Sequence, residues 1–121
     1  MRTIQYYIIS TLLLLGIFTT TESYAADAKT TAEVCWTEAM EAYAEKNYKA
    51  AIEKLEQVVT LGYGSADVYY NLANSYFKLG QSYMAINGKN FSNGELGRAV
   101  LNYRRALKLD PAMEDARYNL D

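Results

Sequence analysis

The feature that most constrains this chain is a helical stripe of apolar residues that occurs twice. In the segment 51–59, apolar side chains fall at positions i, i+1, i+4, i+7 and i+8, and polar side chains fill the positions between them. The segment 99–107 has the same spacing, and an amphipathic segment precedes each stripe, at 36–43 and at 69–77. Because this spacing does not fit the alternation of a strand, it predicts two pairs of α-helices.

Glycine, asparagine and proline mark the expected ends of these helices. Gly62 and Gly80 each follow a leucine, at a place where a left-handed residue would cap a helix. Asn47 adopts that conformation less readily and is expected to make the first turn. Asp110-Pro111 should end the fourth helix, because proline lacks a backbone donor and restricts the residue before it. The chain therefore consists of two predicted helical hairpins and the start of a third.

The second hairpin carries a recognisable repeat. It has the run YYNLANSYFKLG at 69–80, then Ala99, Tyr103 and the run ALKLDP at 106–111. These residues resemble the tetratricopeptide repeat (TPR), a helix-turn-helix unit of about 34 residues. The resemblance implies an all-α fold, in which antiparallel helix hairpins form a TPR-like right-handed superhelical stack.

The first hairpin matches the repeat less well. Glu38, Lys46 and Tyr63 stand where the motif usually has leucine, glycine and proline. A stable stack usually needs roughly three repeats, and this chain has two repeats and one further helix. That last helix is predicted at 113–120, and we expect its Ala116 and Leu120 to have little to pack against. The predicted divisions are a flexible segment at 26–31 and a TPR-like domain at 32–121, with repeat 1 at 32–65, repeat 2 at 66–113 and the start of a third repeat at 114–121.

Repeat spacing also locates an insertion. The corresponding residues Ala51 and Ala99 lie 48 positions apart, which exceeds the repeat length of about 34. The excess is placed at 81–94, inside the second hairpin. Ser92 and Glu95 have the spacing of a capping box, so the helix is expected to restart there. The insertion is either an inert loop whose apolar residues fold back, or a finger specific for a partner.

The first 25 residues have the composition of a signal peptide. Arg2 precedes an apolar run at 4–18, which is followed by polar and then small residues. We expect cleavage after Ala25, and the alternative is an uncleaved N-terminal anchor helix, although the run is short for a membrane span. Cys35 lies too far beyond the run for lipidation. This segment, 1–25, therefore predicts export.

Composition excludes several classes of function. The chain has no histidine and one cysteine, which excludes His-based catalytic triads, His-ligated metal sites and an internal disulfide framework. A formal net charge of -2 does not indicate the excess of basic residues that nucleic-acid binding requires. No pattern predicts a cofactor.

Cys35 is interpreted as a small buried hydrophobe, with an intermolecular disulfide as the alternative. The carboxylate pairs Glu38/Glu41 and Glu53/Glu56 are expected on solvated faces, which suits acid catalysis poorly.

A closer resemblance covers the segment after the predicted cleavage site. The runs DVYYNLAN at 67–74, GRAVLNYRRA at 97–106 and EDARYNL at 114–120 follow Gly62-Tyr63 and a signal-like segment. Together they are similar to the exported TPR component of the Bacteroides aerotolerance (Bat) operon, the BatE type. The resemblance implies a protein of the periplasm, or of the periplasmic face of the inner membrane, in a Bacteroidetes-like bacterium. It also implies von Willebrand A-domain membrane proteins as partners and no catalytic residue. Membrane association would come from an uncleaved signal or a C-terminal continuation.

A TPR-like stack presents a concave surface lined by the first helix of each hairpin. We expect aromatic side chains there to contact a peptide, and Asn74 and Lys78 to hold its amides or an acidic group. The alternative is that aromatic residues at helical spacing belong to the core. The predicted function is a non-catalytic scaffold for protein partners, and the alternative is a cell-envelope protein that binds or hydrolyses glycans. The predicted groove residues are Trp36, Met40, Tyr43, Tyr70, Asn74, Phe77 and Lys78.

Overall fold

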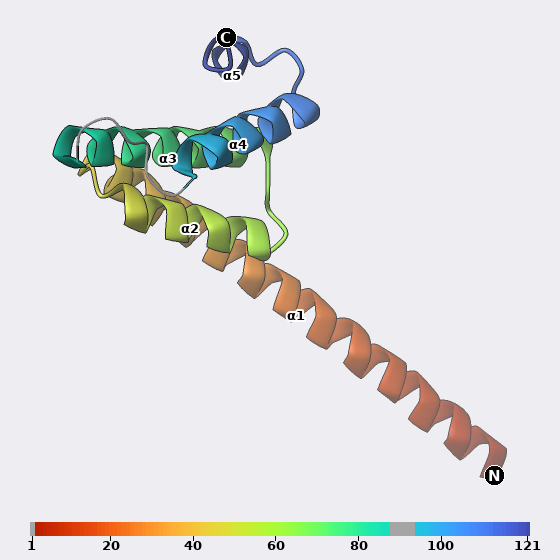
Figure 1. Cartoon of the computed structure of the whole chain (residues 1–121). Helices are drawn as coiled ribbons and strands as arrows, with labels where there is room; N and C mark the ends of the chain where they lie inside the picture. The colour runs from red at the N-terminus through yellow and green to blue at the C-terminus, as the bar shows by residue number, and fades with distance from the viewer. Residues whose placement is uncertain (1, 88–93) are drawn as a thin grey trace. The chain divides into compact units, whose positions relative to one another are not determined.

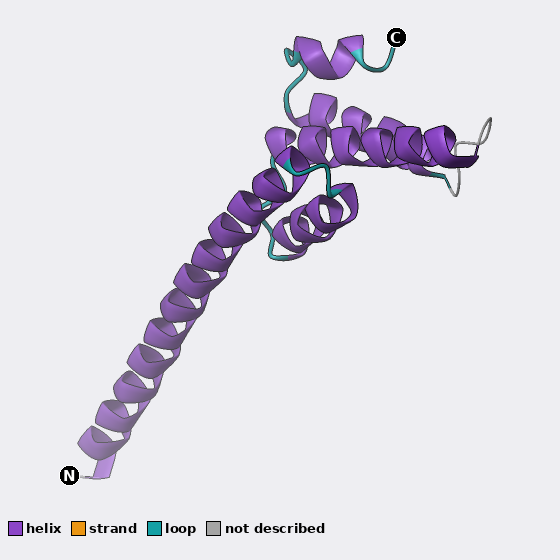
Figure 2. Ribbon diagram, turned by 90° about the vertical axis from the view of Figure 1, so that its left-hand side faces the viewer, coloured by secondary structure: helices purple, strands orange, loops and turns teal. Residues whose placement is uncertain are grey.

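A computed structural model of the chain describes residues 2–87 and 94–121. Over these residues helices are the only regular secondary structure, and no strand is present (Figure 2). The predicted all-α class is therefore confirmed. The helices are α1 (Arg2–Ala44), α2 (Tyr48–Thr60), α3 (Ala66–Asn87), α4 (Glu95–Leu109) and α5 (Glu114–Tyr118).

The chain divides into two compact units, Met1–Thr31 and Ala32–Asp121. Ala32 is also the residue at which the first repeat is predicted to begin. The segment 26–31, expected to be flexible, is helical, and the Thr30 and Thr31 hydroxyls donate to backbone carbonyls four residues earlier. Within the described residues, no helix has both the length and the hydropathy needed to cross a membrane.

The second unit is a stack whose order in space follows the order along the chain. Its helices pack in sequence, with α2 against α3, α3 against α4, and α4 against α5 (Figure 1). One core joins them and contains Leu55 of α2, Leu72 of α3 and Tyr103 of α4, all buried. Alanines at Ala39 and Ala73 are fully buried, because close approach of neighbouring helices requires small side chains. This arrangement is an all-α, TPR-like helical stack.

The turn between α1 and α2 differs from its prediction. The left-handed residue is Lys46, with φ of 62°, and not Asn47, which has φ of -86°. Asn47 instead caps α2, since its side-chain oxygen accepts a hydrogen bond from the backbone N–H of Ala50 at 3.3 Å. Asparagine is a favoured N-cap residue, and this role requires a negative φ. The left-handed Gly62 after α2, with φ of 90°, agrees with the prediction.

The predicted helix end at Gly80 is wrong. Gly80 is buried inside α3, which continues to Asn87. One glycine in a helix interior costs only about 1 kcal/mol relative to alanine. The residues that follow, 81–86, include glutamine, methionine and alanine and no proline, so they favour continuation of the helix. The first part of the predicted insertion therefore lengthens α3.

The described chain resumes at Gly94, which has φ of 83° and precedes α4. Glu95 is the first residue of α4, and the predicted cap at Ser92 lies outside the described residues. At its other end, α4 stops at Leu109, directly before Asp110-Pro111, as the sequence predicts.

The last helix is better packed than expected. Helix α5 is shorter than the predicted helix over 113–120, but its Ala116 is fully buried and joins the core. Leu120 also packs against that core. The expectation that these two residues would have little to bury them is therefore wrong, because α5 packs against α4.

Candidate functional site

The structure brings four of the seven predicted groove residues together in one small pocket. The pocket has a volume of about 190 Å³ and is formed mainly by the first helices of the hairpins, with contributions from α4 and the residue after α5. It combines aromatic rings with amides and one ammonium group, which suits contact with a peptide. The lining residues are Tyr43 of α1, Asn74, Phe77 and Lys78 of α3, Tyr103 of α4, and Asn119.

The other three predicted groove residues lie outside this pocket. Trp36, Met40 and Tyr70 are partly buried and pack against the core. The Tyr70 ring lies 5.9 Å from the ring of Tyr103, measured between centroids, in a tilted arrangement. For these three side chains the structure favours a packing role.

A hydrogen-bonded chain crosses the pocket. The Tyr103 hydroxyl donates to Oδ1 of Asn74 at 2.5 Å and accepts a hydrogen bond from Nδ2 of Asn119 at 3.2 Å. Burial raises the pKa of Tyr103 to about 12, and the nearby Tyr70 adds to this increase, whereas the hydrogen bond from Asn119 lowers the pKa. The hydroxyl therefore stays protonated at neutral pH and acts as a donor to Asn74.

Tyr43 completes the pocket on the α1 side. Its ring meets the ring of Tyr48 edge to face, with 5.3 Å between centroids. Burial raises the pKa of the Tyr43 hydroxyl, and the neighbouring tyrosines Tyr48 and Tyr70 raise it further. This side chain offers a neutral hydroxyl beside an apolar ring.

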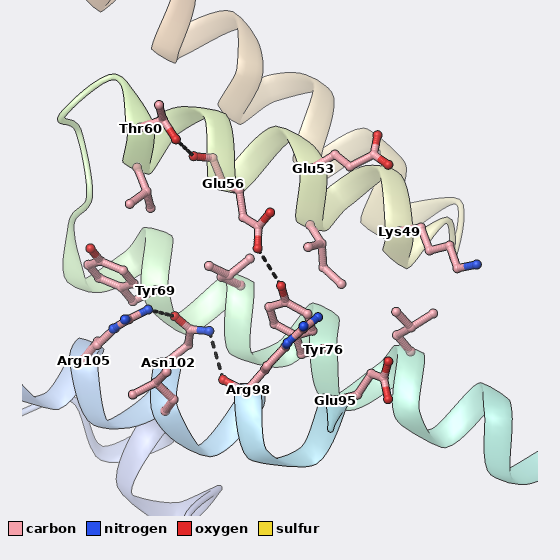
Figure 3. Close-up of a pocket in the computed structure, with 15 residues that line it drawn as sticks. Lys49, Glu53, Glu56, Thr60, Tyr69, Tyr76, Glu95, Arg98, Asn102 and Arg105 are labelled. Atoms are coloured by element: carbon pink, nitrogen blue, oxygen red, sulfur yellow. Dashed lines mark hydrogen bonds between the residues drawn. The ribbon is translucent and has the colours of Figure 1, made fainter. Parts of the chain in front are cut away.

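A larger cleft, of about 700 Å³, lies between the second helices of the two hairpins and was not predicted. Helices α2 and α4 form its walls, and side chains of α3 lie between them (Figure 3). The lining residues are Lys49, Ile52, Glu53, Glu56, Val59 and Thr60 of α2, Tyr69, Leu72, Tyr76 and Leu79 of α3, and Glu95, Arg98, Leu101, Asn102 and Arg105 of α4.

Tyr76 connects the two walls of this cleft. Its hydroxyl donates to Oε1 of Glu56 on α2 at 2.6 Å, and the guanidinium group of Arg98 on α4 lies 5.6 Å from the ring centroid (Figure 3). Burial raises the pKa of Tyr76 to about 12; the hydrogen bond to Glu56 also raises it, and Arg98 lowers it. The Tyr76 hydroxyl therefore stays protonated to a higher pH than the hydroxyl of an exposed tyrosine does.

A second arginine on α4, Arg105, also lies over the ring of a tyrosine. The guanidinium group of Arg105 lies 5.8 Å from the ring centroid of Tyr69, and its Nη1 donates to Oδ1 of Asn102 at 3.3 Å. Asn102 is buried and its Nδ2 donates to the backbone carbonyl of Arg98 at 2.9 Å. Asn102 therefore helps to orient the side chain of Arg105, and its own position is fixed by the hydrogen bond to the backbone of α4.

Glu95 lies at the beginning of the α4 wall. Its side chain is only 6% exposed, and its Oε2 has no hydrogen-bond partner in the described part of the chain. A carboxylate in the first turn of a helix interacts favourably with the helix dipole. On α2, the ammonium group of Lys49 lies 5.7 Å from the ring centroid of Tyr83.

One carboxylate of each pair singled out in the sequence has a structural partner, Glu38 in an ion pair and Glu56 in its hydrogen bond from Tyr76. Nζ of Lys54 and Oε2 of Glu38 form an ion pair at 2.6 Å, and this contact raises the pKa of Lys54. Among the described residues, no group of three acidic, cysteine or histidine side chains could hold a metal ion. Cys35 is buried, as its first interpretation expects, and its thiol donates to Oε1 of Gln57 at 3.2 Å.

The arginine-lined cleft was not predicted from the sequence, because cations such as Arg98 and Arg105 on an amphipathic helix are typical of a solvated face; both side chains are indeed exposed in the structure. A usable signal was present. The two arginines are seven residues apart, which is about two helical turns. Tyr69 and Tyr76 on α3 have the same separation, so each tyrosine can support one arginine.

Comparison with known proteins agrees with this architecture. A family model for the tetratricopeptide repeat matches residues 66–87, the extent of α3. No curated protein and no solved structure matches the chain. Tetratricopeptide repeats are typically non-catalytic and generally mediate protein–protein interaction. The chain therefore contains a tetratricopeptide repeat within an all-α, TPR-like stack of helices.

Proposed function

We propose that this chain is an exported, non-catalytic scaffold that binds a protein partner on the concave surface formed by its first helices. One observation carries the proposal. Tyr43, Asn74, Phe77 and Lys78, which repeat spacing assigns to the groove, line a single pocket together with Tyr103. Side chains held on packed helices lose little conformational freedom on binding, which favours recognition of a flexible segment.

The pocket suits a peptide that carries an acidic group beside an apolar side chain. Phe77 and Tyr43 supply ring surface, and the exposed Lys78 supplies a positive charge. Oδ1 of Asn74 already accepts from Tyr103, so the amide N–H groups of Asn74 are the ones that can bind a peptide carbonyl.

Export and the identity of the partner are supported by the sequence. The segment 1–25 has the order of charge, apolar run and small residues that a signal peptidase reads. The runs at 67–74 and 97–106 are similar to the BatE-type component of the Bat operon. We therefore propose a place in a Bat envelope complex, on the periplasmic side, with von Willebrand A-domain membrane proteins as partners.

The test of binding is capture of these A-domain proteins by the full chain. Lys78→Glu reverses the pocket charge, and we expect it to weaken capture about tenfold or more, since it replaces attraction by repulsion. Lys108→Glu makes the same charge change on the exposed face of α4 and serves as the matched control. Equal capture by both variants would contradict the proposed surface. Retention of the chain on peptidoglycan, lost on substitution of Tyr43, would favour the glycan-binding alternative.

The test of export is the mass and location of the protein in cells. We expect an exported form that begins at Ala26, and we expect Leu13→Arg to abolish it, because a charge in the apolar run prevents recognition as a signal. Retention of the whole chain in the cytoplasm would contradict the export proposal and leave the binding test unaffected.

A further inference from the structure

The two walls of the cleft between α2 and α4 each carry three charged residues and differ in formal net charge. Lys49, Glu53 and Glu56 give the α2 wall a charge of -1, whereas Glu95, Arg98 and Arg105 give the α4 wall a charge of +1. Glu53 and Glu56 lie on α2, across from Arg98 and Arg105 on α4 (Figure 3). Between the walls the lining is partly apolar and includes Leu72 and other aliphatic side chains of α2 and α3. The volume of about 700 Å³ falls within the range of ligand-binding sites, roughly 300–1,000 Å³.

The two arginines are oriented for binding before a ligand arrives. Each guanidinium group lies over a tyrosine ring, Arg98 over Tyr76 and Arg105 over Tyr69. In the part of the chain that the structure describes, neither arginine lies within ion-pair distance of a carboxylate. Stacked guanidinium groups lose less rotational freedom on binding than mobile ones, and their N–H groups remain suited to carboxylates. This wall therefore favours a ligand with acidic groups.

The spacing of the arginines indicates the shape of that ligand. Arg98 and Arg105 are seven residues apart, which corresponds to about 10.5 Å along the axis of α4. A helix that lies alongside α4 presents acidic residues at the same interval when they are also seven positions apart. Its apolar stripe would then cover the aliphatic side chains between the walls, and basic residues on its other edge would face Glu53 and Glu56.

We propose that the α2–α4 cleft binds an amphipathic helix of a partner protein, with acidic residues along one edge of its apolar stripe and basic residues along the other. The argument rests on charge complementarity and on the apolar lining, in the manner of helix-in-groove recognition. It uses none of the residues of the concave pocket. The cleft is thus a second interaction surface, formed by the second helices of the hairpins.

The experiment measures binding of a defined probe to the full chain. The probe is a stapled helix of 15 residues, the length of α4, with a leucine stripe, two glutamates seven positions apart on one edge and lysines on the other. We expect saturable binding, and we expect Arg98→Glu with Arg105→Glu to weaken it at least about fivefold, since both acidic contacts become repulsive. Higher ionic strength should also weaken it.

A charge swap makes the test specific. A second probe exchanges the glutamates and lysines, and it should bind better to the Arg98→Glu, Arg105→Glu, Glu53→Lys variant than to the original chain. The control variant, Arg104→Glu with Lys108→Glu, reverses two charges of α4 that do not line the cleft and should change binding less than about twofold. Circular dichroism of every variant verifies that the helices are retained.

Three results would overturn the proposal. The first is absence of saturable binding by both probes, and the second is weakening below fivefold in the double arginine variant. The third is self-association of the chain that the same variant abolishes, because a second copy would then occupy the cleft. None of these results bears on the concave surface, which the Lys78→Glu experiment tests separately.

Discussion

The hydroxyl of Tyr103 on α4 donates a hydrogen bond of 2.5 Å to the side-chain oxygen of Asn74 on α3. The ring of Tyr103 is buried in the core, so one side chain both packs the two helices together and orients an amide in the concave pocket. Structural stability and the proposed binding surface therefore share this residue.

Tyr103→Phe keeps the ring and removes this hydrogen bond together with the one that the hydroxyl accepts from Asn119. We expect the free energy of unfolding to fall by about 1 kcal/mol, because the Asn74 oxygen loses a partner in a half-buried position. Tyr118→Phe makes the same chemical change on a ring that is 82% exposed and should have little effect. Urea denaturation of the three proteins gives the comparison, and equal midpoints for both variants would contradict the prediction.

Gly62 and Gly97 provide a matched pair of glycines. An added Cβ at either position would meet no atom within 4 Å, so packing does not distinguish them. Gly62 has φ of 90°, and alanine there should cost about 1 kcal/mol of backbone strain. Gly97 lies inside α4, where alanine should instead stabilise by about 0.5–1 kcal/mol. Thermal melts that shift in the same direction for both variants would refute this assignment.

Much of the helix order could be predicted from the sequence because local signals determine it. The stripes at 51–59 and 99–107 correspond to α2 and α4, and Asp110-Pro111 ends α4 through the chemistry of proline itself. The helix end expected at Gly80 failed for a different reason. A glycine favours a helix end only when the residues after it do not favour continuation, and here they do.

The candidate pocket could be predicted only in part. Asn74, Phe77 and Lys78 share a face because they are three and four residues apart on one helix. Tyr103 and Asn119 come from other parts of the chain, and their approach depends on how α4 and α5 dock, which helical spacing does not encode. The cleft was missed for the same reason, since the tyrosines that support Arg98 and Arg105 belong to another helix.

Ala106 reports on how closely the helices of the stack approach. It is fully buried in α4, so leucine there must displace neighbouring side chains and should destabilise the stack by about 1–3 kcal/mol. Ala85→Leu adds the same atoms at an exposed position of α3 and should change stability by less than about 0.5 kcal/mol. Urea denaturation checks both variants, and tolerance of Ala106→Leu would indicate a loosely packed stack.

The raised pKa of Tyr76 predicts a loss of stability at high pH. In the folded chain the pKa of Tyr76 rises from its ordinary value of 10.0 to about 12, chiefly through burial and then through the hydrogen bond to Glu56. Between these two pH values the unfolded chain loses the tyrosine proton more readily than the folded chain does. Unfolding therefore releases a proton, and the free energy of unfolding falls as pH rises from about 10 to about 12.

Tyr76→Phe tests this directly, because phenylalanine has no proton to lose. The variant should be less stable at pH 8, since Glu56 loses its hydrogen bond, but its stability should decline less steeply above pH 10. The pKa of Tyr103 is raised to a similar value, so Tyr76→Phe with Tyr103→Phe should flatten the decline further. Urea denaturation at pH 8, 10 and 11 measures these slopes. Identical slopes in the original chain and both variants would show that neither hydroxyl holds its proton more tightly in the folded state.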